Sequence, residues 1–207
     1  MTQYINIHPE NPQPRLLEQT AGLLREGAVA ALPTDSCYSL ACHLGDAAAL
    51  EKIRKIRGID DHHLMTLMCR DLSDIGQYAR VDNAQYRLLK LATPGAYTFV
   101  LEGTKELPRR ILHPKRKTLG LRIPDHRIML GILEALGEPL LTTTLMLPGE
   151  EQPLTDGWTI KEQLPQLDLV VEGGWCGTEP TTVIDLCEMP PTVLREGHGP
   201  LAPLGLG

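Results

Sequence analysis

Aromatic residues are scarce in this sequence: its 207 residues include one Phe, two Trp and five Tyr. Leu, Ile, Val and Ala must therefore fill the core. No apolar stretch approaches the ~20 residues that a membrane-crossing helix needs, so we expect no contact with a membrane. The sequence also has no Gly/Ser-rich linker, low-complexity tract or repeat. A chain of this length suits one substantial core, and residues 1–207 are expected to form a single domain.

Cysteine usage argues against a disulfide framework. The five cysteines are an odd set and include no CxxC pair, which favours a reduced, cytoplasmic protein and argues against a zinc ribbon. The first residues lack a basic stretch followed by an apolar run, so no signal peptide is predicted. The pairs Cys42-His43 and His62-His63 do not complete a known ligand spacing, and we expect no metal site.

Several catalytic motifs are missing as well. The sequence contains no GxSxG, GxGxxG or GxxxxGK(S/T), which leaves a nucleophile elbow, a Rossmann loop and a Walker loop unsupported.

The net charge of −6 argues against a nucleic-acid binder, but the charges are unevenly distributed. Residues 105–127 hold eight basic and two acidic side chains, whereas residues 150–196 hold ten acidic and two basic ones. Such a run is either a solvated face or a binding surface for a polyanion, and the sequence leaves both readings open. If it binds double-stranded RNA or tRNA, the residues concerned are Arg109, Arg110, Lys115, Arg116 and Lys117.

Apolar spacing predicts an α/β protein. Helices are expected at 14–27, 47–57, 71–79, 82–91 and in a segment after Asp125, which should cap it. Strands are expected at 28–32, 64–69, 96–101, 118–123, 139–144, 167–172, 181–186 and 192–195. The last strands have no helices between them, so the sheet should be twisted and mixed, with parallel and antiparallel pairs.

The stretch Ala28 to Leu40 is the most informative one. A buried strand is bounded by Gly27 and Pro33, and the small or polar residues Thr34 to Cys37 follow. We expect the strand end to open toward solvent. Hydroxyls and a carboxylate at such a mouth suit ligand binding, although a plain strand-to-loop transition has the same appearance.

Lys55-Ile-Arg57 marks the end of a predicted helix, where a lysine and an arginine can meet a phosphate. Cations also simply suit a helix C-terminus. Lys52-Ile-Arg54 repeats the pattern one turn earlier, so spacing alone does not decide between them.

Seven short segments follow one another in the order of a known set of motifs. Pro33 to Leu40 is similar to PT(E/D)TxYGL, and Lys55-Ile-Arg57 to KxR. The others are Pro94 to Leu101 (PGPxTxVL), Leu119 to Pro124 (VGVRxP), Val170 to Gly174 (DGG), Pro180 to Asp185 (STVVD) and Leu194 to Gly197 (LRPG). As a set, these segments resemble the threonylcarbamoyl-AMP synthase (YrdC/YciO) family, and most closely its YciO branch.

The resemblance implies a YrdC-like twisted sheet with a concave, positively charged cavity. In that family the cavity binds ATP, with magnesium as an accompanying ion, and threonine. Bicarbonate is condensed with them to threonylcarbamoyl-AMP for tRNA modification. By the same resemblance, Lys55, Arg57, Thr118, Thr144, Met146 and Arg195 would bind the nucleotide, and Ser36, Arg122 and Thr181 the threonine.

The sequence departs from the family at several of these places. The family's SAN triplet is Thr144-Leu145-Met146 here, and a thioether cannot replace an amide that donates and accepts hydrogen bonds. A glycine is replaced by Ser39, and a Lys/Asn-Pro-Leu loop by Asp61-His62-His63-Leu64. We therefore expect an ATP/AMP-binding protein whose own synthase (nucleotidyltransferase) activity is weak or altered. The alternatives are an RNA-binding module without turnover and a nucleotide phosphohydrolase.

Overall fold

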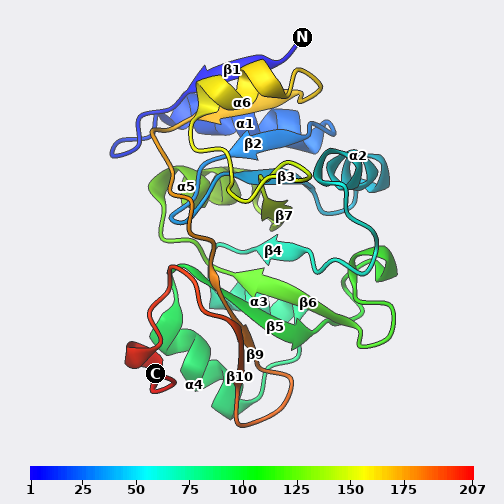
Figure 1. Cartoon of the computed structure of the whole chain (residues 1–207), viewed down its shortest axis with the longest axis vertical. Coiled ribbons are helices and arrows are strands. Elements are labelled where there is room, and N and C mark those ends of the chain that lie inside the picture. Colours follow the sequence, from blue (N-terminus) through cyan, green and yellow to red (C-terminus); the bar gives the residue numbers. More distant parts are fainter.

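The computed structural model describes residues 1–207, and all of its strands belong to one ten-stranded sheet (Figure 1). The strands are β1 (Gln3–Asn6), β2 (Ala30–Leu32), β3 (Ser39–His43), β4 (Thr66–Met68), β5 (Tyr97–Glu102), β6 (Thr118–Arg122), β7 (Leu140–Thr144), β8 (Leu169–Glu172), β9 (Thr182–Asp185) and β10 (Thr192–Arg195).

The strand order is β1-β8-β2-β3-β7-β4-β6-β5-β9-β10. Five of the nine strand pairs are antiparallel and four are parallel, which confirms the predicted mixed α/β sheet. The N-terminus lies at the β1 edge and the C-terminus near the β10 edge (Figure 1).

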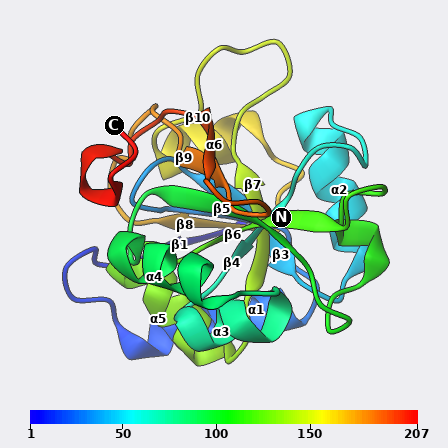
Figure 2. The ribbon, with the colours of Figure 1, turned by 90° about the horizontal axis from the view of Figure 1, so that it is seen from below.

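Six α-helices pack against the sheet: α1 (Pro14–Arg25), α2 (Ala47–Arg57), α3 (Leu72–Tyr78), α4 (Asn83–Ala92), α5 (Arg127–Leu136) and α6 (Gly157–Gln163). Two short 3-10 turns, η1 (Arg109–Ile111) and η2 (Ala202–Leu204), complete the fold. Figure 2 shows α1, α3, α4 and α5 on one side of the molecule and α6 on the other. None of these helices combines the length and the apolar character that crossing a membrane would take.

Alternation along the strands divides the core into two layers. In β2, Ala30 and Leu32 pack with α1 and α5, whereas Ala31 belongs to the larger cluster that contains Leu50 of α2 and Ile160 of α6. β2 is fully buried between β8 and β3, as its apolar run predicts.

Local signals set most of the helix ends. Asp46 caps α2 by accepting a hydrogen bond from the Ala49 N–H, and Gly58 ends that helix in the left-handed conformation, with φ of 67°. The prediction that Asp125 caps α5 is wrong. The helix begins at Arg127, and the Nδ1 of His126 accepts from the Met129 N–H at 3.4 Å.

Three of the strands and α-helices, β1, β3 and α6, were not predicted. β1 and α6 are short segments with few apolar residues, so their sequences show no clear periodicity. α6 buries only Gly157 and Ile160. β3 follows the turn at residues 33–38 and pairs antiparallel with β2 and β7. This hairpin folds the chain back over Thr34, Ser36 and Cys37, which are buried. The expectation that the end of β2 opens to solvent is therefore wrong.

Candidate functional site

A cavity of about 480 Å³ lies over the middle of the sheet. Hydroxyl-bearing side chains dominate its lining, together with three arginines, two histidines and one glutamate. The lining residues that carry polar side chains are Ser36, Ser39, Arg57, His62, His63, Thr66, Thr98, Arg122, Thr142, Thr143, Thr144, Glu151, Thr178, Thr181 and Arg195.

Strand register builds the floor of this cavity. Thr142 of β7 pairs with Thr66 of β4, which pairs with Gly120 of β6, so neighbouring strands present these positions on one face. A Cβ at Gly120 would lie 2.8 Å from Thr98 Cγ2 and 3.0 Å from Thr66 Oγ1. A glycine at this position lets the two threonines approach each other across β6.

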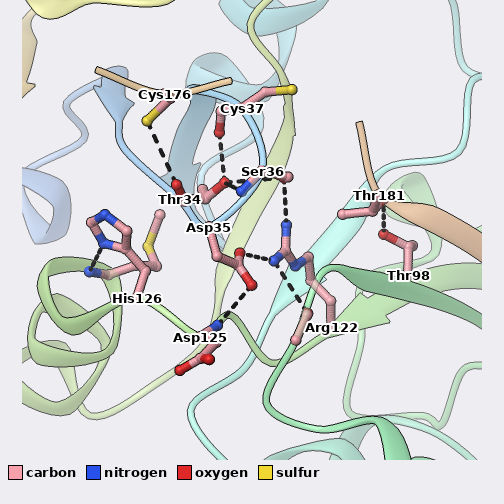
Figure 3. A network of polar contacts seen from close by, with 12 residues as sticks. Thr34, Asp35, Ser36, Cys37, Thr98, Arg122, Asp125, His126, Cys176 and Thr181 are labelled. Atoms are coloured by element: carbon pink, nitrogen blue, oxygen red, sulfur yellow. Dashed lines mark hydrogen bonds and ion pairs between the residues drawn. The ribbon is translucent and has the colours of Figure 1, made fainter. Parts of the chain in front are cut away.

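The turn after β2 supplies one wall of the site, as Figure 3 shows. The Thr34 hydroxyl donates to the Cys37 carbonyl at 2.6 Å and accepts from the Ser36 N–H at 3.1 Å. These bonds fix the turn and direct the Ser36 side chain into the cavity. Burial raises the pKa of the Cys37 thiol to about 11, so this cysteine is not a ready nucleophile.

Arg122 lies at the centre of the polar network in Figure 3. Its Nη1 donates to Ser36 Oγ at 3.2 Å, and its Nη2 is paired with the Asp35 carboxylate and donates to the Gly95 carbonyl at 3.3 Å. The other oxygen of Asp35 accepts from the Asp125 N–H at 2.9 Å. The Nε of Arg122 is buried and has no hydrogen-bond partner in the protein.

Arg57 and Arg195 enter the same cavity from α2 and β10, and neither forms an ion pair with a carboxylate. Arg57 Nη1 donates to the Met146 carbonyl at 2.9 Å. Arg195, at the exposed rim, donates from Nε and Nη2 to the Thr181 carbonyl at 3.1 and 2.8 Å. Partial burial lowers the pKa of both guanidiniums. Since neither is paired with a carboxylate, the protein leaves their charges uncompensated. An anion in the cavity would compensate them.

Thr144 and Met146 line the cavity as the resemblance implied. Thr144 ends β7, and the chain continues with Leu145 buried beneath. Thr181 is held by its neighbours: its hydroxyl lies 2.7 Å from that of Thr98 and 3.3 Å from Arg195 Nη2.

Two residues assigned to the nucleotide, Lys55 and Thr118, do not join this cavity. Lys55 is exposed on α2, because two residues along a helix rotate its side chain away from that of Arg57. Thr118 shares its strand face with Arg122 but stands at the other end of β6, opposite Glu102. It lines a separate pocket with Arg80, Arg116 and Cys187.

The basic segment forms a surface of its own. Arg109, Arg110, Lys115 and Lys117 are exposed without a carboxylate partner, whereas Arg116 is paired with Asp185 at 2.8 Å. The segment is attached to the region of α2 in two places: Arg110 Nη2 donates to the Gly45 carbonyl at 2.8 Å, and Arg54 Nη2 to the Arg110 carbonyl at 3.1 Å.

Sequence reasoning missed Asp35 as the partner of Arg122, and His63 and two threonines of β7, Thr142 and Thr143, as lining residues. A carboxylate at the mouth of a strand was a signal for the first. The run Thr142 to Thr144, three hydroxyl side chains at a predicted strand end, was a signal for the last.

One exposed group, Asp60, Asp61 and His62, offers ligand atoms within 4.8 Å of one another. Exposed acidic groups of this kind are common without an ion, and we assign no metal to it.

Comparisons with known proteins agree with the family resemblance of the sequence motifs. The Sua5/YciO/YrdC family, described as "Telomere recombination", matches residues 22–197. The uncharacterized protein YciO of Escherichia coli K12 is 52% identical over 204 residues, which cover 98% of this chain and 99% of YciO. The threonylcarbamoyl-AMP synthase of Mus musculus is 33% identical over 79% of this chain, and the match spans 60% of the synthase.

Solved structures agree in fold. The crystal structure of E. coli YciO matches with a TM-score of 0.95 over 99% of this chain and 100% of its own. Sua5 of P. abyssi, complexed with L-threonine, is 27% identical with a TM-score of 0.87, over 95% of this chain and 58% of Sua5. The chain thus spans about three fifths of the length of the Mus musculus synthase and of P. abyssi Sua5.

Proposed function

The chain belongs to the Sua5/YciO/YrdC family and is related to threonylcarbamoyl-AMP synthases, and on that premise we propose that its cavity binds ATP or AMP together with threonine. The synthase activity of the protein is weak or altered under this proposal. The same proposal places the protein in the cytoplasm and relates its function to tRNA modification. Magnesium would bind together with ATP.

The observation that carries the proposal is the pair of arginines without carboxylate partners. Arg57 and Arg195 bring two positive charges to one cavity, and both are fixed by backbone carbonyls. Fixed guanidiniums suit phosphate oxygens because two N–H groups can donate in parallel. The cavity volume of about 480 Å³ lies within the usual range of small-molecule sites.

A separate part of the cavity suits the amino acid. Arg122 Nη1 donates to Ser36 Oγ at 3.2 Å and both side chains line the cavity, where a guanidinium and a hydroxyl are donors that suit a carboxylate. Asp35 already neutralises the charge of this arginine. Threonine should therefore bind here more weakly than the nucleotide binds near Arg57 and Arg195.

The side chain of Met146 is the reason to expect little turnover. If carbamoylated threonine attacks the α-phosphate of ATP, negative charge develops on the phosphoryl oxygens while pyrophosphate leaves. A donor at this position would stabilise that charge, and a thioether has no N–H or O–H to donate.

Calorimetric titration of the natural protein with ATP, AMP and threonine separately tests the proposal, combined with an assay for pyrophosphate release that depends on threonine and bicarbonate. We expect saturable binding of ATP and slow release of pyrophosphate. Absence of ATP and AMP binding at millimolar concentration would refute the nucleotide site, and fast release would refute the weak activity.

The exposed basic segment favours a second candidate function, binding of double-stranded RNA or tRNA. Four of its cations have no carboxylate partner, and the segment adjoins the region of α2 that carries exposed Lys55. Binding to phosphates in a duplex should be nearly independent of sequence and strongly dependent on salt. The phosphohydrolase alternative draws only on the same cavity and has no observation of its own.

A further inference from the structure

His63 is a titratable group of the cavity to which the proposed function gives no role. It lies in the turn between α2 and β4, half-buried, where its backbone N–H donates to the Asp60 carbonyl at 3.3 Å. Its Nε2 is 3.4 Å from the hydroxyl of Thr143, and its Nδ1 has no hydrogen-bond partner in the protein. The ring therefore has one nitrogen anchored to β7 and the other free.

The surroundings of His63 disfavour its charged form. Burial lowers the pKa of the imidazole below its ordinary value of 6.5, and the charges of Arg57 on α2 and Arg195 on β10 lower it further. Asp60 in the same turn acts in the opposite direction. The other charged or titratable groups that line the cavity are Arg122, which is paired with Asp35, Glu151 and the exposed His62. Without an anion, His63 is thus neutral at neutral pH.

An anion between the two arginines reverses this situation. Its negative charge offsets the two guanidiniums that oppose protonation, and it can accept a hydrogen bond from Nδ1, which is stronger when the ring is charged. We propose that His63 is a proton-dependent third cation of the cavity, so that an anionic ligand and one proton are bound together. This inference rests on the proposed function in that the natural anion would be a nucleotide phosphate.

Linkage gives the proposal a measurable form. If the anion raises the pKa of His63, proton and anion binding strengthen each other, and each unit of that rise corresponds to about a tenfold tighter complex once the ring is charged. Affinity should therefore fall as the pH rises through the range in which the ring of the complex loses its proton. A histidine with only a packing role would show neither the shift nor the slope.

The experiment uses the full-length protein and measures the pKa of each histidine ring by NMR between pH 5 and 9 without ligand, with sulfate and with ATP. Sulfate does not titrate in this range, so any shift that it causes belongs to the protein. We expect the pKa of His63 to rise by about one unit or more with either ligand. The signals of exposed His198, which does not line the cavity, serve as the internal reference in the same spectra.

Two variants separate charge from packing. His63→Gln retains hydrogen-bonding groups toward Thr143 but cannot gain a proton, and its sulfate affinity should lose its dependence on pH. His63→Lys carries the charge permanently and should bind sulfate tightly at pH 8, where the natural protein has weakened. His198→Gln is the matched control and should keep the slope of the natural protein.

The outcomes distinguish this inference from the proposed function. ATP binding without a change in the His63 pKa overturns the inference and leaves the nucleotide site standing. A shift with sulfate in a protein that does not bind ATP supports the third cation and overturns the nucleotide assignment. Binding of neither anion overturns both, and an unchanged slope in His63→Gln overturns the inference alone.

Discussion

Replacing Arg57 by methionine should weaken ATP binding by about 10- to 150-fold. Hydrogen bonds to charged groups contribute ~1.5–3 kcal/mol each, and ~1.4 kcal/mol is a tenfold change in affinity. Arg57 lines the cavity and has no carboxylate partner, so its charge is available to the ligand. Methionine keeps an unbranched, flexible side chain at this position and removes only the guanidinium.

The fold should tolerate this change. The variant loses one hydrogen bond, from Arg57 Nη1 to the Met146 carbonyl, which is worth ~1 kcal/mol net. It also removes an Nε that is buried without a partner, so part of that loss is offset. A change of ~1 kcal/mol moves the melting temperature of a protein of this size by about 2–4 °C.

Lys55→Met is the matched control for Arg57→Met. Both positions lie on α2 near its C-terminus, and both variants lose one positive charge, but Lys55 is exposed and outside the cavity. ATP titration by calorimetry and a thermal melt of each variant are the measurements. The reasoning fails if Arg57→Met folds and binds ATP like the natural protein, or if Lys55→Met loses as much affinity.

Three further predictions follow from other parts of the structure. Met146→Asn combined with Thr144→Ser should raise the rate of pyrophosphate release that requires threonine and bicarbonate, because it returns a donor to the cavity; a rate that stays flat while ATP still binds would contradict this. Reversing Arg109, Arg110 and Lys115 to Glu should abolish binding of duplex RNA in a mobility-shift assay at low salt, whereas binding that survives high salt, or its absence in the natural protein, would discard the RNA surface. Burial lowers the pKa of His126, so the unfolded chain takes up a proton that the folded state resists; stability should be full above pH 6.5 and fall below it, a fall that urea unfolding would detect and that His126→Gln should reduce.

The sequence predicted the α/β class, the mixed sheet and most helices because those features depend on local signals. Alternating apolar residues, Asp46 as a cap and Gly58 as a stop act over a few residues each. The hairpin that contains β3 depends instead on its pairing with β7, about a hundred residues further along the chain. No local pattern reports such a partner.

The candidate site was predictable in its residue types but only partly in its membership. Ser36, Arg57, Arg122 and Arg195 meet in one cavity as the resemblance implied, and Met146 joins them. Lys55 and Thr118 do not, because helix rotation and position along a strand decide which side chains share a space. A sequence motif such as Lys55-Ile-Arg57 specifies neither the rotation of a side chain about the helix axis nor the position of a residue along a strand.

The pairing of Arg122 with Asp35 shows a second limit. The two residues are separated by 87 positions in the sequence, and only the fold reveals that the turn after β2 neutralises the arginine of β6. That contact changes the expected chemistry, since it divides the cavity into a compensated end near Arg122 and an uncompensated end near Arg57 and Arg195.

A crystal structure of this protein with bound ATP tests the central claim most directly. The account predicts nucleotide density in the threonine-lined cavity, with phosphate oxygens in contact with the guanidiniums of Arg57 and Arg195. Nucleotide bound instead in the separate pocket beside Thr118 and Arg116, or on the outer surface, would contradict it.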